Sequence, residues 1–121
     1  MSVAENRAPT FRKPQVSVRF HRQRDHISIA VDGGLDLASA PQLDECLERA
    51  VRGDGTVELD LSRVDFVDCA GWRPITAAAS SLEEDGRSLR IVALSPAAAR
   101  LVELIGEQPG IELVPSGLPL D

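Results

Sequence analysis

One segment near the middle of the chain, 57–71, constrains the fold more than any other part of the sequence. Apolar and polar residues alternate from Val57 to Leu61, which is typical of a β-strand with one buried face. A stretch rich in aspartate follows, and apolar residues at helical spacing begin at Gly71. We therefore expect a strand, an acidic loop and a helix in succession. The N–H groups that open such a helix favour an anion, and carboxylates around them would make an added phosphate a switch through charge repulsion.

Strand and helix patterns also alternate along the rest of the chain. Two short alternating runs predict a pair of strands, with 21–26 as a hairpin loop and Gly33-Gly34 ending the second strand. Ser39–Gln42 has the pattern of a capping box, and Ser95-Pro96 has the pattern of a capped helix start. The order of the elements predicts an α/β fold with a mixed β-sheet of about four to five strands and three or four helices packed against it.

Proline restricts where the helix after the acidic loop can start. Pro74 is comfortable only in the first turn of a helix, so we expect this helix to begin at or after Ala70-Gly71, or to be distorted there. We also expect a flexible arm at 1–15 and a tail at 115–121, on either side of one domain at 16–114.

Composition narrows the class of protein. The net charge is −6, from 13 basic and 19 acidic residues, which argues against binding to nucleic acid or to an anionic membrane. No apolar run approaches the roughly 20 residues that span a bilayer, so we expect no membrane insertion and a cytoplasmic location. The two cysteines predict neither a metal site nor a disulfide framework, and we expect no cofactor. The sequence lacks a Ser/His/Asp arrangement and a phosphate-binding loop with lysine, which favours a binding module over an enzyme.

Two segments carry a resemblance to a known family. The pattern Leu-Asp-Leu-Ser-x-Val-x-Phe-Val-Asp at 59–68, followed by two small residues and Gly71, resembles the signature of STAS domains, the fold of anti-sigma-factor antagonists. The segment Gly-Leu-Asp-Leu-Ala-Ser-Ala at 34–40 is similar to the family segment before its first helix. The resemblance covers about 16–114 and implies a single STAS-like domain.

The resemblance implies a bacterial protein-interaction module for transcription regulation by partner switching. The expected partner is an anti-sigma factor of the histidine-kinase-like ATPase type, whose binding would relieve sigma-factor inhibition, and a homodimer is left open. In the family, the residue after the loop aspartate is usually a Ser or Thr that the kinase phosphorylates. Here the two small residues are Cys69 and Ala70, which implies an antagonist without the standard phosphorylation switch. Alternatives are a STAS subunit of another assembly (a transporter ATPase partner or a stressosome-type scaffold) or a redox sensor based on Cys69.

The expected partner-binding residues lie near the two matching segments and are Asp36, Asp68, Cys69, Gly71, Trp72 and Arg73. Several of them have a structural alternative. Asp68 fits both a functional carboxylate and an N-cap, and an aspartate after two glycines, as at position 36, often stabilises a turn. Cys69 fits a reactive thiol at a helix N-terminus, opposed by nearby carboxylates, or a small buried residue. Trp72 fits an interface anchor or a core residue.

Overall fold

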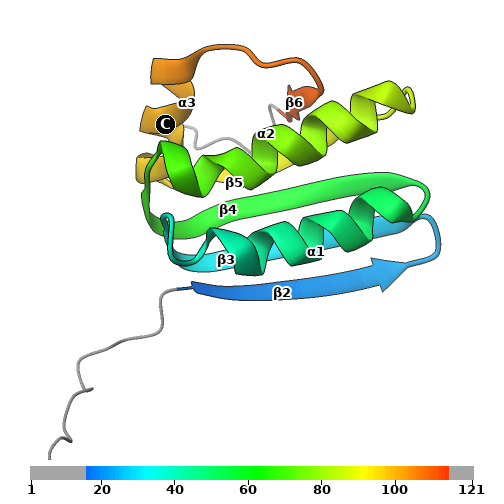
Figure 1. Cartoon of the computed structure of the whole chain (residues 1–121), viewed down its shortest axis with the longest axis horizontal. Coiled ribbons are helices and arrows are strands. Elements are labelled where there is room, and N and C mark those ends of the chain that lie inside the picture. Colours follow the sequence, from blue (N-terminus) through cyan, green and yellow to red (C-terminus); the bar gives the residue numbers. More distant parts are fainter. Residues whose placement is uncertain (1–15, 115–121) are drawn as a thin grey trace, which may run out of the picture.

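The computed structural model describes residues 16–114, so the expected arm at 1–15 and tail at 115–121 lie outside the described residues. The elements are β2 (Val16–Gln23), β3 (His26–Leu35), α1 (Ala40–Arg52), β4 (Thr56–Val67), α2 (Cys69–Glu84), β5 (Leu89–Leu94), α3 (Pro96–Ile105) and β6 (Ile111–Leu113). The five strands form one sheet in the order β2-β3-β4-β5-β6 (Figure 1). Strand β2 is antiparallel to β3, and the other neighbouring pairs are parallel. The expected mixed sheet in an α/β fold is confirmed.

The core lies between the sheet and the two long helices. Alternate residues of the central strands, such as Ile29 and Leu59, are fully buried, because one face of the sheet is covered. Helices α1 and α2 lie side by side over this face and contribute Leu43, Leu47 and Ile75 to the same cluster (Figure 1). Aliphatic side chains therefore build the core, as the low aromatic content of 3% requires.

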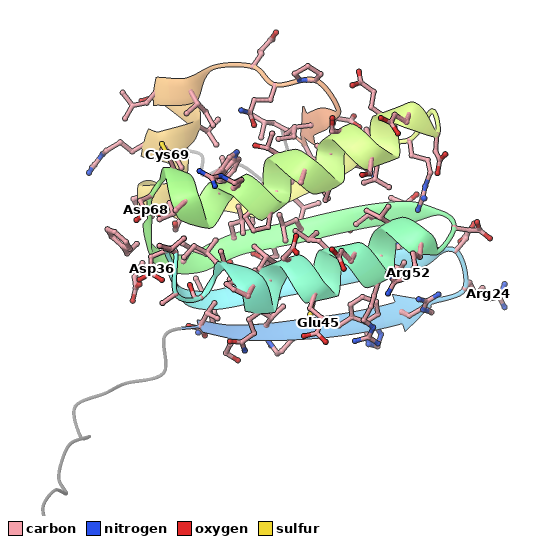
Figure 2. All side chains as sticks on the ribbon, in the orientation of Figure 1. Arg24, Asp36, Glu45, Arg52, Asp68 and Cys69 are labelled. Atoms are coloured by element: carbon pink, nitrogen blue, oxygen red, sulfur yellow. The ribbon has the colours of Figure 1, made fainter. Side chains whose placement is uncertain are left out.

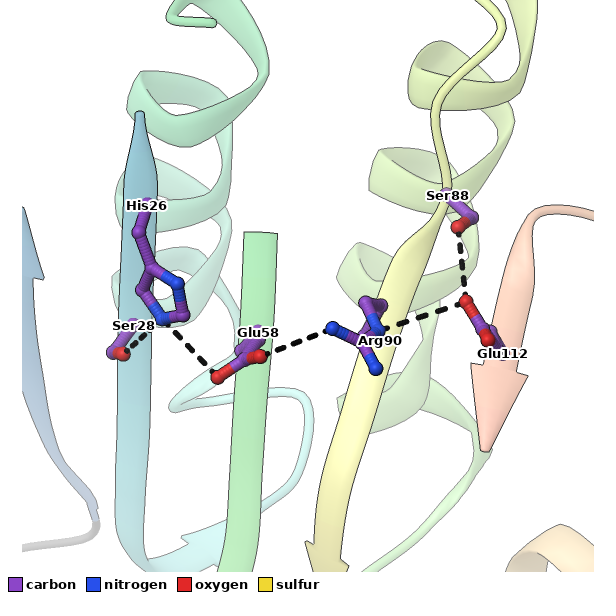
Figure 3. A network of polar contacts seen from close by, with 6 residues as sticks. All are labelled: His26, Ser28, Glu58, Ser88, Arg90 and Glu112. Atoms are coloured by element: carbon purple, nitrogen blue, oxygen red, sulfur yellow. Dashed lines mark hydrogen bonds and ion pairs between the residues drawn. The ribbon is translucent and has the colours of Figure 1, made fainter. Parts of the chain in front are cut away.

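The opposite face of the sheet is polar. His26 and Ser28 alternate with buried residues of β3, so their side chains point away from the core, and Figure 3 shows the network that they join. Glu58 lies at its centre, with Oε1 at 3.1 Å from His26 Nε2 and Oε2 at 3.3 Å from Arg90 Nη1. The Arg90 Nε atom lies 3.6 Å from Glu112 Oε1 on β6. Because these groups are partly exposed to water, the network links four strands but adds little stability.

Strands β3 and β4 are longer than the sequence predicts. The expectation that Gly33-Gly34 ends the first of them is wrong, because β3 continues through both glycines to Leu35. The expectation of an acidic loop after Leu61 is also wrong, because β4 continues to Val67 beside the end of β3. The pairing absorbs register shifts between Ala30 and Asp32 and between the two glycines. Such irregularities break the alternation of apolar and polar residues that reveals a strand in sequence.

The hairpin between β2 and β3 is tighter than expected. Strand pairing continues to Gln23 and His26, so the turn contains only Arg24 and Asp25, not the whole of 21–26. Arg24 has φ 47°, the left-handed conformation that a short hairpin turn requires. Within the described part of the chain, no helix is long and apolar enough to cross a membrane.

Candidate functional site

The candidate site lies at the junction between β4 and α2. Asp68 follows the last residue of β4 in an extended conformation, and its Oδ1 accepts a hydrogen bond of 2.9 Å from the Gly71 N–H. The N-cap interpretation of Asp68 is thus confirmed, and its carboxylate also complements the positive end of the helix dipole. Cys69 is the first residue of α2, and its side chain is exposed next to this cap (Figure 2).

The helix itself begins earlier than proline chemistry predicts. It runs from Cys69, one residue before the expected start at Ala70-Gly71, and Pro74 lies inside it. Proline has no N–H group, so the Ala70 carbonyl loses the partner that it would have four residues later in a regular helix. The Trp72 N–H still bonds to the Asp68 carbonyl at 3.0 Å, which keeps the first turn closed.

Gly71 lets the first turn of α2 approach the end of β3 closely. It is buried, and a Cβ atom at this position would overlap the carbonyl of Leu35 and approach the backbone nitrogen of Asp36. The Asp68 N–H also bonds to the Leu35 carbonyl at 3.1 Å. Both segments that carry the family resemblance therefore meet at one point, and Gly71 acts there by packing. A contact between Gly71 and a partner stays a prediction.

Asp36 and Ser39 cap the start of α1 through each other. The Ser39 N–H donates to Asp36 Oδ1 and the Asp36 N–H donates to Ser39 Oγ, both at 3.0 Å. The Ala40 N–H bonds to the Asp36 carbonyl at 2.9 Å, so the chain already turns helically from Asp36. The expected capping box at Ser39–Gln42 is wrong, because Ser39 makes no side-chain cap bond to α1 and pairs instead with Asp36 in the turn before the helix. Buried Ser39 also donates to the Gly34 carbonyl at 2.7 Å.

Trp72 and Arg73 are neighbours in α2 but differ in burial. Trp72 is only 4% exposed, and its indole Nε1 donates to Gln108 Oε1 at 3.0 Å. The core interpretation of Trp72 is therefore confirmed, and a contact between Trp72 and a partner stays a prediction. Arg73 is exposed and borders a shallow apolar groove between α1 and α2.

Sequence reasoning missed this groove and the apolar residues near it. We call it the α1–α2 groove; it has a volume of about 350 Å³ and is lined by Leu37, Ala40, Pro41, Asp44, Ala70, Arg73, Pro74 and Ala77. Leu37 is 73% exposed at its rim, and Phe66, two residues before Asp68, is 50% exposed. Large exposed apolar side chains near a groove are typical of interaction surfaces. Leu37 lies in the turn before α1, and a large apolar residue in such a turn is the signal that could have identified it.

The two cysteine thiols differ in surroundings. Cys46 lies on α1 against the core, and burial raises the pKa of its thiol above the ordinary value, with Arg49 opposing this rise and Glu45 adding to it. Cys69 is exposed. Among residues 16–114, no group of three or more His, Cys, Asp or Glu side chains is placed to hold a metal ion.

Comparison with known proteins agrees with this arrangement. A family model described as "Mlab, STAS domain" matches residues 18–114. An anti-sigma-B factor antagonist of Listeria monocytogenes is 34% identical over 93 residues, which cover 76% of this chain and 82% of that protein.

Solved structures share the fold. An anti-sigma factor antagonist from Mycobacterium paratuberculosis matches with a TM-score of 0.72 and 24% identity, over 84% of this chain and 86% of that one. The anti-sigma factor antagonist SpoIIAA of Bacillus, in its unphosphorylated form, matches with a TM-score of 0.67 and 19% identity, over 81% of this chain and 88% of that one. With a family model that covers most of the sequence and a relative above 30% identity, this chain belongs to the STAS-domain family.

Proposed function

We propose that this chain is an anti-sigma-factor antagonist, which binds an anti-sigma factor and so relieves the inhibition of a sigma factor. A relative that is 34% identical over most of both chains carries this name. The structural observation that carries the proposal is the exposed position of Cys69 on the first turn of α2, beside the α1–α2 groove. A partner that docks there would contact a helix N-terminus and an apolar surface at once.

The chemistry of the groove defines what kind of partner surface fits. Leu37 and the small residues of the floor offer apolar area, and Arg73 offers a cation at the edge. A partner that presents an apolar side chain flanked by a carboxylate would therefore cover the apolar area of the groove and pair its carboxylate with Arg73. We assign the direct contacts to Leu37, Cys69 and Arg73. Asp36 and Asp68 act mainly by capping the two helices that form the groove.

The proposed partner is an anti-sigma factor of the histidine-kinase-like ATPase type. A kinase of this kind would find no hydroxyl at position 69, where the chain has a thiol. The antagonist would then stay competent to bind unless a serine or threonine elsewhere is modified. The proposed protein differs from a phosphorylation-controlled antagonist in one side chain, which is the thiol of Cys69 in place of a hydroxyl.

The test is a binding and transcription experiment with purified proteins. We expect the protein to bind one of the kinase-like anti-sigma factors of its source organism in titration calorimetry. We also expect it to restore transcription by the matching sigma factor when that anti-sigma factor is present. Binding to a transporter ATPase or to a stressosome-type scaffold, with none to any anti-sigma factor, would instead favour a subunit of another assembly.

A further inference from the structure

The start of α2 is weak as an isolated helix. Its first six residues include Gly71, one of the residues least favourable in a helix, and Pro74, which removes one backbone hydrogen bond. The same turns carry exposed Cys69 and Arg73, which are proposed to contact the partner. Groups outside the helix must therefore help to keep these two side chains in place.

Gln108 supplies such support from the segment between α3 and β6. Its Oε1 atom accepts a hydrogen bond of 3.0 Å from Trp72 Nε1 and another of 3.1 Å from the Thr76 hydroxyl. Trp72 and Thr76 are four residues apart, so one side-chain oxygen joins two successive turns of α2 on the same face. The indole N–H can only donate, and this fixes the amide of Gln108 with its oxygen toward the helix.

Packing alone does not hold the Gln108 side chain. It borders a hollow of about 390 Å³ whose walls also include Trp72, Ile105 and Leu113. A half-buried side chain with free volume on one side can change rotamer unless hydrogen bonds restrain it. The two bonds to α2 are therefore the restraint, and they span the turn that contains Pro74.

We propose that Gln108 is a positioning residue: it fixes the first two turns of α2 through Trp72 and Thr76, and so sets the orientation of Cys69 and Arg73 toward the partner. The inference rests on the proposed function for its partner, but its structural part concerns the free protein. It assigns the segment between α3 and β6 a role in the site, although this segment follows Cys69 by more than thirty residues in sequence.

Two variants separate the hydrogen bonds from the packing. Gln108→Met keeps the length of the side chain and removes the acceptor, whereas Gln108→Glu keeps an acceptor oxygen in the same place. Hydrogen exchange should become at least about fivefold faster in Gln108→Met at the amides of Trp72, Arg73 and Ile75, because the variant loses both hydrogen bonds and one ordinary bond alone contributes about that factor. Exchange in the second half of α2 should stay unchanged, and Gln108→Glu should resemble wild type. The indole N–H resonance of the only tryptophan should shift in Gln108→Met alone.

Affinity for the anti-sigma factor completes the test. We expect Gln108→Met to weaken binding about fivefold and Gln108→Glu to leave it near the wild-type value. Unchanged exchange in Gln108→Met, or faster exchange along the whole of α2, overturns the inference. The inference is also overturned if Gln108→Met binds the anti-sigma factor like wild type while Cys69→Glu binds it more weakly. In that case the proposed function stands. If Cys69→Glu also binds like wild type, the proposed docking site fails as well.

Discussion

Cys69 is the residue at which this chain departs chemically from the pattern that its family resemblance implies. Its thiol is close to a serine hydroxyl in size and occupies the first position of α2, where N–H groups and the helix dipole favour an anion. Asp68 already satisfies one of these N–H groups through its bond to Gly71. The geometry for a phosphate-bearing residue is thus present around a side chain that lacks the hydroxyl.

Replacing Cys69 with serine tests this geometry. We expect a kinase-like anti-sigma factor with ATP to add one phosphate to Cys69→Ser and none to the wild-type protein or to Cys69→Ala. The added group brings about −1.5 to −2 charge to the docking surface, so the phosphorylated variant should bind its partner less well. Intact mass spectrometry followed by calorimetry measures both effects. A phosphate on the wild-type chain at position 69 contradicts the first part, and an unmodified serine variant indicates that the partner is not a kinase.

The two thiols should react at different rates. We expect a maleimide to label exposed Cys69 about tenfold faster than Cys46 at neutral pH, because Cys46 is partly buried and its raised pKa leaves less thiolate. Raising the pH should narrow the difference as the Cys46 thiol ionises. The fast phase should vanish in Cys69→Ala and persist in Cys46→Ala. A fast phase that survives in Cys69→Ala would show that the exposure of the two side chains is assigned in the wrong order.

At the scale of elements, the strand β5 and the start of α3 were readable from sequence. Leu89–Leu94 is apolar except for Arg90 and forms β5. Ser95 caps α3 by accepting from the Ala98 N–H at 3.1 Å, as a serine before a proline predicts. These features depend on residues close together in the chain. The extension of β4 to Val67 does not, because it is stabilised by pairing with β3 across register shifts.

The site was only partly readable for the same reason. Sequence placed Asp68 and Cys69 at a helix start, where local capping decides the conformation. It left Trp72 with two interpretations, a core residue or an interface anchor, and it did not reveal that Trp72 bonds to Gln108, because 36 residues separate the two. Nor did it reveal the α1–α2 groove, which exists only when two helices pack side by side.

The contact between α2 and β3 predicts the effect of a small substitution. Gly71→Ala should lower the free energy of unfolding by about 2 kcal/mol or more, because the added methyl group meets backbone atoms of Leu35 and Asp36 that cannot move aside easily. Gly86→Ala is the matched control, since φ is 74° there but open space surrounds the site, and it should cost about 1 kcal/mol through backbone strain alone. Urea unfolding of the two variants measures the difference. If both variants lose the same free energy of unfolding, the backbone around Gly71 makes room for the methyl group without an energetic cost.

At the scale of the whole molecule, the fold brings the site to one edge of the sheet. Parallel strands β3 and β4 end together, and the loops that follow them start α1 and α2 next to each other (Figure 1). In open α/β sheets this carboxyl edge is the usual place for binding, because loops and helix N-termini converge there. The polar network on the uncovered face runs across the strands and has no part in that convergence (Figure 3).

The position of the α1–α2 groove on the molecule leads to a comparison between two exposed leucines. Leu37 is 73% exposed at the rim of the groove, and Leu104 is 77% exposed on α3. If the groove is the docking surface, Leu37→Ala should weaken partner binding by about 1–2 kcal/mol, whereas Leu104→Ala should change it by no more than about 0.5 kcal/mol. Since both substitutions remove the same atoms from a solvent-exposed site, general effects on solubility or folding cancel in the comparison.

Charge at the helix start should act on the same surface. Cys69→Glu places a carboxylate where the partner must approach and should weaken binding more than Cys69→Ala, which removes little volume and no charge. Arg73→Ala should weaken binding by about 1–2 kcal/mol if its guanidinium pairs with a partner carboxylate. Calorimetry gives the affinities, and circular dichroism with thermal melting must show that each variant keeps the wild-type fold. If all these folded variants bind like wild type, the partner docks elsewhere, and the preserved helix start serves the stability of this chain alone.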